Sequence, residues 1–178
     1  MKIILFSTED SMSDVSRLES TSASDFHAFH IRKPNWSKEK LEEYITHLPL
    51  EWLSIAVLHS HFDLLNDFNI KGIHLNEKNR SEGIDAKYHS NILSTSFHTI
   101  EDLVADESNY EYVFLSPIFD SISKQGYKSA FNFEYLKQVN TESSHDIIAL
   151  GGVDSNKFKE CKSLGFKGVA ILGSFWNT

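Results

Sequence analysis

Eight short apolar runs recur along the chain, and segments with a helical pattern separate several of them. The runs cover residues 3–6, 26–31, 53–58, 72–75, 91–97, 112–119, 147–153 and 168–172. Near-continuous apolar runs of this length are typical of strands that are buried on both faces, as in parallel sheets. Strands that alternate with helices imply parallel pairing through crossover connections, because a tight turn cannot join parallel neighbours.

Eight such units predict an α/β fold of the (β/α)₈ barrel type. The chain has 178 residues, whereas such barrels usually run to about 250, so we expect a compact barrel. Residues 11–24 are rich in Ser, Asp and Glu and predict an irregular or mobile substitute for the first helix. Because of this segment, the first helix is expected to be short or missing. Little chain follows the last run, so the same is expected of the last helix. An open doubly wound sheet is the alternative.

Local signals mark several of the helices between the runs. Four apolar positions follow the i, i+3, i+4, i+7 spacing of one helix face: Leu41, Tyr44, Ile45 and Leu48. Ser37 is the expected N-cap of this helix. Thr99 and Asp102 resemble a capping box before a later helix. Gly165 is expected to end the helix whose face carries Phe158, Cys161 and Leu164.

Composition and charge narrow the class of protein. No repeat or linker divides the chain, so residues 1–178 are expected to form one domain. A formal net charge of −8 argues against nucleic acid as the main partner. The chain has no apolar stretch of membrane-spanning length, and its start reads as a first strand rather than a signal peptide. A single cysteine, Cys161, excludes an internal disulfide and favours a cytoplasmic protein. The sequence does not determine the oligomeric state, and a homo-oligomer is one option.

Candidate anion-binding residues follow the sixth run. Ser121, Ser123 and Lys124 carry hydroxyl and ammonium donors that suit phosphate oxygens. A solvated turn of the same composition is the alternative. In either fold considered, the chemistry belongs at the carboxyl ends of the strands. We therefore expect these three residues at that end of the sheet.

Two more runs have glycine at or near their ends, and one carries a histidine and an arginine. Gly151 and Gly152 lie near the end of the seventh run, and Gly173 directly follows the eighth. Glycine allows close approach of backbone N–H groups to a phosphate, although a tight turn without ligand explains the pair equally well. His30 and Arg32 share a face of the second strand. Arg32 is expected to bind a second phosphate or to pair with an acid at the rim.

Ordered short motifs across five strands resemble the thiamine-phosphate synthase/thiazole tautomerase family. The second strand of that family carries a Gln/His-x-Arg-x-Lys pattern, and residues 30–34 read HIRKP. The other matching segments are residues 73–79 (IHLNEKN), 94–98 (STSFH), 116–124 (SPIFDSISK) and 149–153 (ALGGV). The resemblance covers nearly the whole chain.

The resemblance implies a (β/α)₈ barrel enzyme of thiamine biosynthesis. The synthase is a transferase that couples hydroxymethylpyrimidine diphosphate with a thiazole phosphate and releases pyrophosphate, with Mg²⁺. By analogy, four residues hold the pyrophosphate: Arg32, Ser96, Ser123 and Lys124. The thiazole phosphate is expected on Ser121, Ser123, Gly151, Gly152, Leu172 and Gly173. Catalysis is expected from Lys124, Arg32 and His30, and the partners are phosphorylated small molecules.

The chain departs from the family at both expected Mg²⁺ ligands. The Asn-Asp pair that ends the third strand of the family is His59-Ser60 here, and the second aspartate is Asn79. Mg²⁺ prefers carboxylate oxygens, so Mg²⁺ is only weakly supported. Asp63 and Glu77 are the possible substitutes. The second-strand lysine is Pro34, and the neighbouring Lys33 is expected to compensate in part.

Three other functions therefore stay open. One is a tautomerase-like isomerase that needs no metal. The histidine at position 30 resembles that branch of the family. In that branch the proton-transferring histidine lies in the segment 116–119, so His30, His59 or His74 would have to replace it. Another is a phosphate-ligand binder without catalysis. A further one is a zinc site of His59, His61 and His74.

Overall fold

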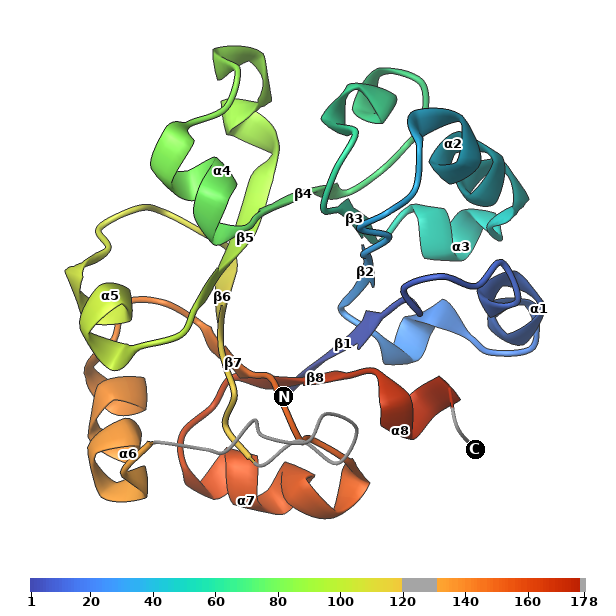
Figure 1. Ribbon diagram of the computed structural model, residues 1–178. Coiled ribbons are helices and arrows are strands. Elements are labelled where there is room, and N and C mark those ends of the chain that lie inside the picture. The colour runs from blue at the N-terminus through green and yellow to red at the C-terminus, as the bar shows by residue number, and fades with distance from the viewer. Residues whose placement is uncertain (120–130, 177–178) are drawn as a thin grey trace.

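The computed structural model describes residues 1–119 and 131–176 of the chain. Within these residues, parallel strands form one closed barrel in chain order, with helices outside it (Figure 1). The strands are β1 (Lys2–Phe6), β2 (Ala28–Ile31), β3 (Ala56–Leu58), β4 (Gly72–Leu75), β5 (Ile92–Phe97), β6 (Tyr112–Leu115), β7 (Ile147–Ala149) and β8 (Gly168–Ile171). β8 closes the barrel by pairing with β1, for example Ile4 opposite Ala170. The predicted barrel is confirmed, and the open sheet is wrong.

One predicted strand begins too early. The run 53–58 is a strand only from Ala56, because Leu53 is the last residue of the short helix α3 (Leu50–Leu53). Trp52 in this helix is wholly buried, and its indole Nε1 donates hydrogen bonds to the carbonyls of Leu18 (3.0 Å) and Thr21 (3.1 Å). An apolar run alone does not distinguish the end of a buried helix from the start of a buried strand.

Helices follow the strands around the outside of the barrel. They are α1 (Asp14–Glu19), α2 (Lys38–His47), α3, α4 (Glu77–Glu82), α5 (Ile100–Ala105), α6 (Phe133–Glu142), α7 (Phe158–Ser163) and α8 (Gly173–Trp176). Four 3₁₀ turns add η1 (Ala23–Asp25), η2 (Phe62–Asn66), η3 (Ala86–Asn91) and η4 (Ser155–Lys157). α1 has six residues and α8 has four. The first and last helices are thus short but present, and the segment 11–24 holds a real helix.

The capping signals lie where the sequence placed them. The side chain of Ser37 accepts a hydrogen bond from the backbone N–H of Lys40, and Thr99 accepts one from that of Asp102. Gly165 follows α7 with a φ of +87°, a left-handed conformation that glycine adopts without strain. These caps fix where each helix begins or ends and therefore how it returns to the next strand.

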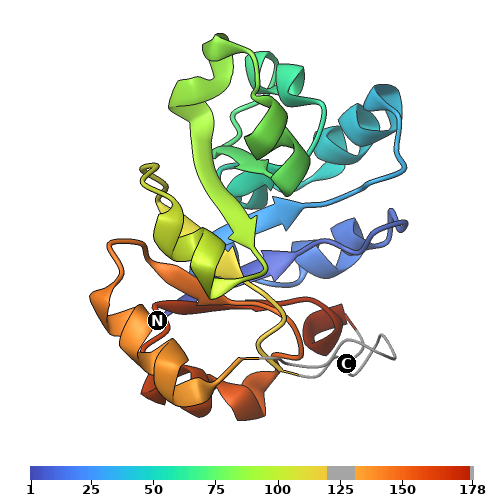
Figure 2. The same cartoon turned by 60° about the vertical axis from the view of Figure 1, so that its left-hand side comes forward.

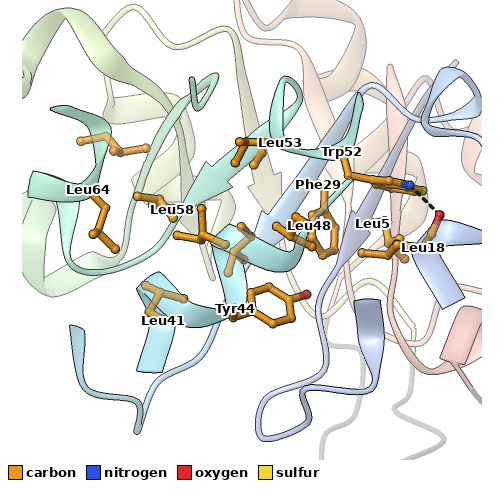
Figure 3. Packing of buried hydrophobic residues seen from close by; sticks show 14 of the residues in the cluster. Leu5, Leu18, Phe29, Leu41, Tyr44, Leu48, Trp52, Leu53, Leu58 and Leu64 are labelled. Atoms are coloured by element: carbon orange, nitrogen blue, oxygen red, sulfur yellow. Dashed lines mark hydrogen bonds between the residues drawn. The ribbon is translucent and has the colours of Figure 1, made fainter. Parts of the chain in front are cut away.

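The core has two layers. Inside the barrel, a cluster of aliphatic and aromatic side chains fills the space: Ile4, Phe6, Ala28, Val57, Tyr112, Phe114, Ile148 and Ala170. Between the strands and the helices lie two larger clusters, one of which includes Leu18, Phe29 and Trp52 (Figure 3). Alternate strand residues face the two layers, so each strand is apolar on both sides.

Parallel strands bring all their carboxyl ends to one face, which we call the barrel mouth. In side view the arrowheads of β1 and β2 lie next to each other and point the same way (Figure 2). The residues that follow the strands therefore converge at the mouth although they are far apart in sequence. None of the described helices is long and apolar enough to cross a membrane.

Candidate active site

The mouth collects most of the predicted site residues. Arg32 directly follows β2, Gly151 and Gly152 follow β7, and Gly173 follows β8. Because the strands are parallel and adjacent in a closed barrel, these segments share one end of the molecule. The arginine and the paired glycines therefore lie at one end of the barrel, while their joint binding of a phosphorylated ligand stays a prediction. Three predicted residues lie outside the described part of the chain: Ser121, Ser123 and Lys124.

His30 lies inside the barrel rather than on its rim. Its side chain is wholly buried and stacks on Phe6, with ring centroids 4.9 Å apart. Its Nδ1 lies 2.9 Å from Nε2 of His59, and its Nε2 lies 2.7 Å from the hydroxyl of Tyr112. His30 is therefore enclosed, whereas its neighbour His59 is only partly buried, and the catalytic role of His30 stays a prediction.

Ser96 and His74 extend this polar cluster toward β5. The Ser96 hydroxyl lies 3.1 Å from Nε2 of His74, whose Nδ1 lies 2.9 Å from the hydroxyl of Ser94. The rings of His59 and His74 stack with centroids 4.3 Å apart. Ser96, predicted as a pyrophosphate ligand, thus has a histidine partner and remains partly exposed.

Burial keeps the three histidines of this cluster uncharged. Desolvation is the main cause that holds the pKa of His30 and of His59 well below the usual value. Repulsion between a protonated imidazole and the neighbouring histidines and basic side chains lowers both further. Burial, and then the charges of Arg80 and Arg32, lower the pKa of His74 to about 3. At neutral pH each imidazole is therefore neutral, with one nitrogen carrying a lone pair.

Arg32 and Arg80 bring two positive charges close to His74 at the mouth. Both lie close enough to His74 for their charges to lower its pKa. Arg32 also forms an ion pair with Glu9, in the segment that follows β1. The expectation of a rim pair with an acid is thereby confirmed. Its side chain is 43% exposed, so an anion can reach it.

Arg80 was not predicted as a site residue. It projects from α4, donates to the hydroxyl of Thr95 (2.9 Å) and the carbonyl of Ser96 (2.6 Å), and lies over the ring of Phe97. The signal was available: Asn76 caps α4, and a residue four positions later faces the same side as the cap. Charge alone did not mark it, because exposed arginines are common on helices.

The glycine pair adopts backbone conformations that other residues avoid. Gly151 has a φ of +92° and Gly152 a φ of +65°. A Cβ on Gly151 would lie 2.9 Å from Cα and Cβ of Pro117. Tight packing therefore explains Gly151, while phosphate binding by this turn remains a prediction. Leu172, which directly follows β8, is 39% exposed, and its carbonyl accepts hydrogen bonds from the backbone N–H groups of Phe175 and Trp176.

The expected Mg²⁺ ligands do not form a Mg²⁺ site among the described residues. Ser60 and Asn79 offer no carboxylate, and Asn79 donates its backbone N–H to the cap residue of α4. Asp63 pairs with Lys38, and Glu77 is exposed in the first turn of α4. Mg²⁺ prefers several hard oxygens in octahedral geometry, which these residues do not supply.

Two further expectations are corrected by the structure. Lys33 does not replace the missing lysine at the mouth, because it is buried in an ion pair with Asp14. The pair His59 and His61 does not form a zinc site with His74, since Nε2 of His61 lies 3.0 Å from the carbonyl of Trp36. The side chain that joins His59 and His74 is that of His30.

A separate groove of about 430 Å³ lies between α5 and α6. Its lining includes Leu103, Val104, Tyr135 and Val139 and no residue of the mouth. The mouth, with its two arginines and buried histidines, therefore remains the candidate active site.

The described residues thus form a closed (β/α)₈ barrel of the enzyme type, with Arg32, Arg80 and buried histidines at its mouth. Residues 3–175 match the model of the family described as thiamine monophosphate synthase. The chain belongs to that family. The match extends over all eight strands, which confirms the resemblance seen in the sequence motifs.

Individual relatives agree with this assignment. A thiamine-phosphate synthase of Clostridium tetani is 28% identical over 66% of this chain. That alignment spans 57% of the length of the relative. A putative thiamine-phosphate synthase 2 of Aquifex aeolicus is 25% identical over 76% of this chain and 74% of its own. The crystal structure of thiamine phosphate pyrophosphorylase from Bacteroides thetaiotaomicron is 31% identical, with a TM-score of 0.79, over 99% of this chain and 85% of that one.

Proposed function

We propose that this protein is a transferase of thiamine biosynthesis that couples hydroxymethylpyrimidine diphosphate with a thiazole phosphate. Its family membership supports this reaction. The observation that carries the proposal is the position of Arg32 and Arg80 at the mouth of the barrel. Both lie close enough to His74 for their charges to lower its pKa. Two guanidinium groups at one mouth suit a substrate with several phosphate charges.

The chemistry requires that negative charge be held on the leaving group. The bond between the pyrimidine methylene carbon and the diphosphate oxygen breaks, and its electron pair leaves with pyrophosphate. The thiazole nitrogen then donates its lone pair to the methylene carbon, which forms the new C–N bond. Arg32 is expected to neutralise the departing pyrophosphate, because positioned cations stabilise charge that develops in the transition state.

Other residues are assigned supporting roles. The partly exposed Ser96 hydroxyl is expected to donate to a phosphate oxygen, and the neutral His74 beside it accepts or donates as that hydroxyl turns. The motif predicts Ser123 and Lys124 as further pyrophosphate ligands. Gly152 and Gly173 are expected to present backbone N–H groups to the thiazole phosphate.

The described residues do not suit Mg²⁺, so no step is assigned to it. The coupling assay is therefore run with and without Mg²⁺. The purified protein is mixed with both substrates, and thiamine phosphate and pyrophosphate are measured. Equal amounts of the two products support the proposal. Isomerisation of the thiazole alone, or saturable binding of phosphate compounds without turnover, contradicts it.

A matched pair of variants locates the reaction. Arg32→Gln removes one charged hydrogen-bond donor, which is worth about 1.5–3 kcal/mol, so kcat/KM is expected to fall by about 10- to 150-fold. Lys137→Gln removes the same charge from an exposed position on α6 and is expected to leave the rate unchanged. Equal rates for the two variants would remove Arg32 from the site.

A further inference from the structure

Three imidazoles from consecutive strands meet inside the barrel. His30 lies on β2, His59 follows β3, and His74 lies on β4. One nitrogen of each lies within 4.8 Å of the others. We propose that His30, His59 and His74 bind one divalent transition-metal ion, and that Zn²⁺ suits them best. This site does not depend on the coupling reaction.

The donor set selects the class of metal. Imidazole nitrogen suits Zn²⁺, Cu²⁺, Ni²⁺ and Co²⁺, whereas Mg²⁺ and Ca²⁺ prefer oxygen ligands. Three histidines with an open fourth position are a known arrangement for zinc. One of the three, His59, directly precedes Ser60, the residue that stands in place of an expected Mg²⁺-binding aspartate. This barrel thus offers nitrogen donors next to the position where carboxylates are missing.

The distances require only a small adjustment. Zinc–nitrogen bonds are about 2.0–2.1 Å long, so two nitrogens of a tetrahedral site lie about 3.4 Å apart. His30 Nδ1 and His59 Nε2 are 2.9 Å apart, and the most distant pair of the three lies within 4.8 Å. Closing that pair takes a movement of roughly 1.4 Å at most, judged against the tetrahedral spacing.

Hydroxyl groups behind the imidazoles fix their orientation. When His30 binds metal through Nδ1, its Nε2–H donates to the hydroxyl of Tyr112, 2.7 Å away. His74 has a serine hydroxyl at each nitrogen, Ser94 at Nδ1 and Ser96 at Nε2. Whichever nitrogen takes the metal, the other keeps a partner. Such outer partners set the tautomer of a ligating histidine and strengthen metal binding.

The surroundings act on the ion in two opposite ways. The hydroxyl groups of Tyr112, Ser94 and Ser96 orient the imidazoles for binding. The charges of Arg32 and Arg80 oppose a cation. An anion in the fourth position reduces that repulsion, and the partial exposure of His59 leaves the cluster accessible from the mouth.

The test uses the full chain without an affinity tag, freed of metal by a chelator. Calorimetric titration with ZnCl₂ is expected to show one ion per chain, and MgCl₂ in excess is expected not to compete. Co²⁺ is expected to give the visible absorption of a tetrahedral nitrogen site. Failure of both Zn²⁺ and Co²⁺ to bind stoichiometrically would overturn the proposal.

Variants assign the ligands. His59→Gln and His74→Gln are each expected to weaken Zn²⁺ binding by at least 100-fold and to abolish the Co²⁺ absorption. His61→Gln, two positions from a ligand, and His89→Gln, in the exposed part of η3, are expected to bind like the unmodified protein. Retained affinity in His59→Gln, or loss in His61→Gln, contradicts the assignment.

A separate measurement distinguishes loss of a zinc ligand from failure of a variant to fold. Circular dichroism of each metal-free variant shows whether it has folded. His74 is buried, so His74→Gln carries the greater risk. His59 is only partly buried, and His59→Gln decides the question by itself. Tyr112→Phe keeps the ring and removes only the hydroxyl behind His30, and it is expected to weaken Zn²⁺ binding by about 10- to 100-fold.

Discussion

Lys33 and Asp14 form an ion pair in which both side chains are wholly buried, with Nζ 2.9 Å from Oδ2. Asp14 also accepts hydrogen bonds from Thr8 and from the hydroxyl of Tyr44. The pair joins α1 to the end of β2, so it fixes the first helix to the barrel. Removing one partner leaves a buried charge without compensation.

We therefore expect Lys33→Met to lower the free energy of unfolding by about 3–5 kcal/mol. Urea denaturation measures the change. The control is Lys38→Met, because Lys38 pairs with Asp63 at a site where both side chains are 40% or more exposed. Such exposed pairs are worth about 0–1 kcal/mol. Equal losses in the two variants would show that the buried pair contributes no more than the exposed one.

Glu9 competes with any anion for Arg32, because the two side chains form an ion pair at the mouth. Glu9→Gln frees the guanidinium, so the affinity for pyrophosphate is expected to rise. An exposed pair is worth about 0–1 kcal/mol, which corresponds to a gain of up to about fivefold. Calorimetric titration with pyrophosphate measures it. Glu51→Gln, in the exposed part of α3, should bind pyrophosphate as the unmodified protein does. A lower affinity of Glu9→Gln for pyrophosphate would contradict the competition.

Gly151 and Gly83 separate backbone strain from packing. Both have positive φ, +92° and +81°. A Cβ at Gly83 meets nothing within 4 Å, whereas one at Gly151 lies 2.9 Å from Pro117. Gly83→Ala is expected to cost about 1–3 kcal/mol from strain. Gly151→Ala is expected to cost about 1–3 kcal/mol more from overpacking. Thermal and urea unfolding compare the two, and a smaller loss for Gly151→Ala would contradict the packing argument.

Cys161 is expected to be unreactive in the folded protein. The thiol is buried in the layer between barrel and helices, and this burial raises its pKa from the usual 9.0 to about 11. The thiolate is the reactive form, so this higher pKa reduces the amount of thiolate about 100-fold at neutral pH, before access is considered. Labelling by a chromogenic disulfide is expected to be at least that much slower in buffer than in urea.

A positive control accompanies the labelling experiment. Lys137→Cys, made in a Cys161→Ala background, places a thiol on an exposed position of α6 and is expected to react at the same rate in buffer and in urea. Rapid labelling of Cys161 in buffer would mean that the layer around α7 opens readily.

The sequence determined the parts of the fold that depend on near neighbours in the chain. The eight apolar runs located all eight strands, because the period and length of such runs reflect burial. Ser37, Thr99 and Gly165 marked helix ends correctly, since capping is a contact within one turn. The run 53–58 failed at Leu53, where α3 and β3 are both buried and the pattern does not change.

For the candidate site, the sequence placed Arg32 and the glycine pair at the right end of the barrel, because that end follows from strand direction alone. The tertiary structure decided which side chains meet. It paired Lys33 with the buried Asp14, brought Arg80 from α4 to Ser96, and placed His30 instead of His61 beside His59 and His74. These contacts join residues from different strands and helices, and barrel closure with its register fixes them, so no local spacing in the chain encodes them.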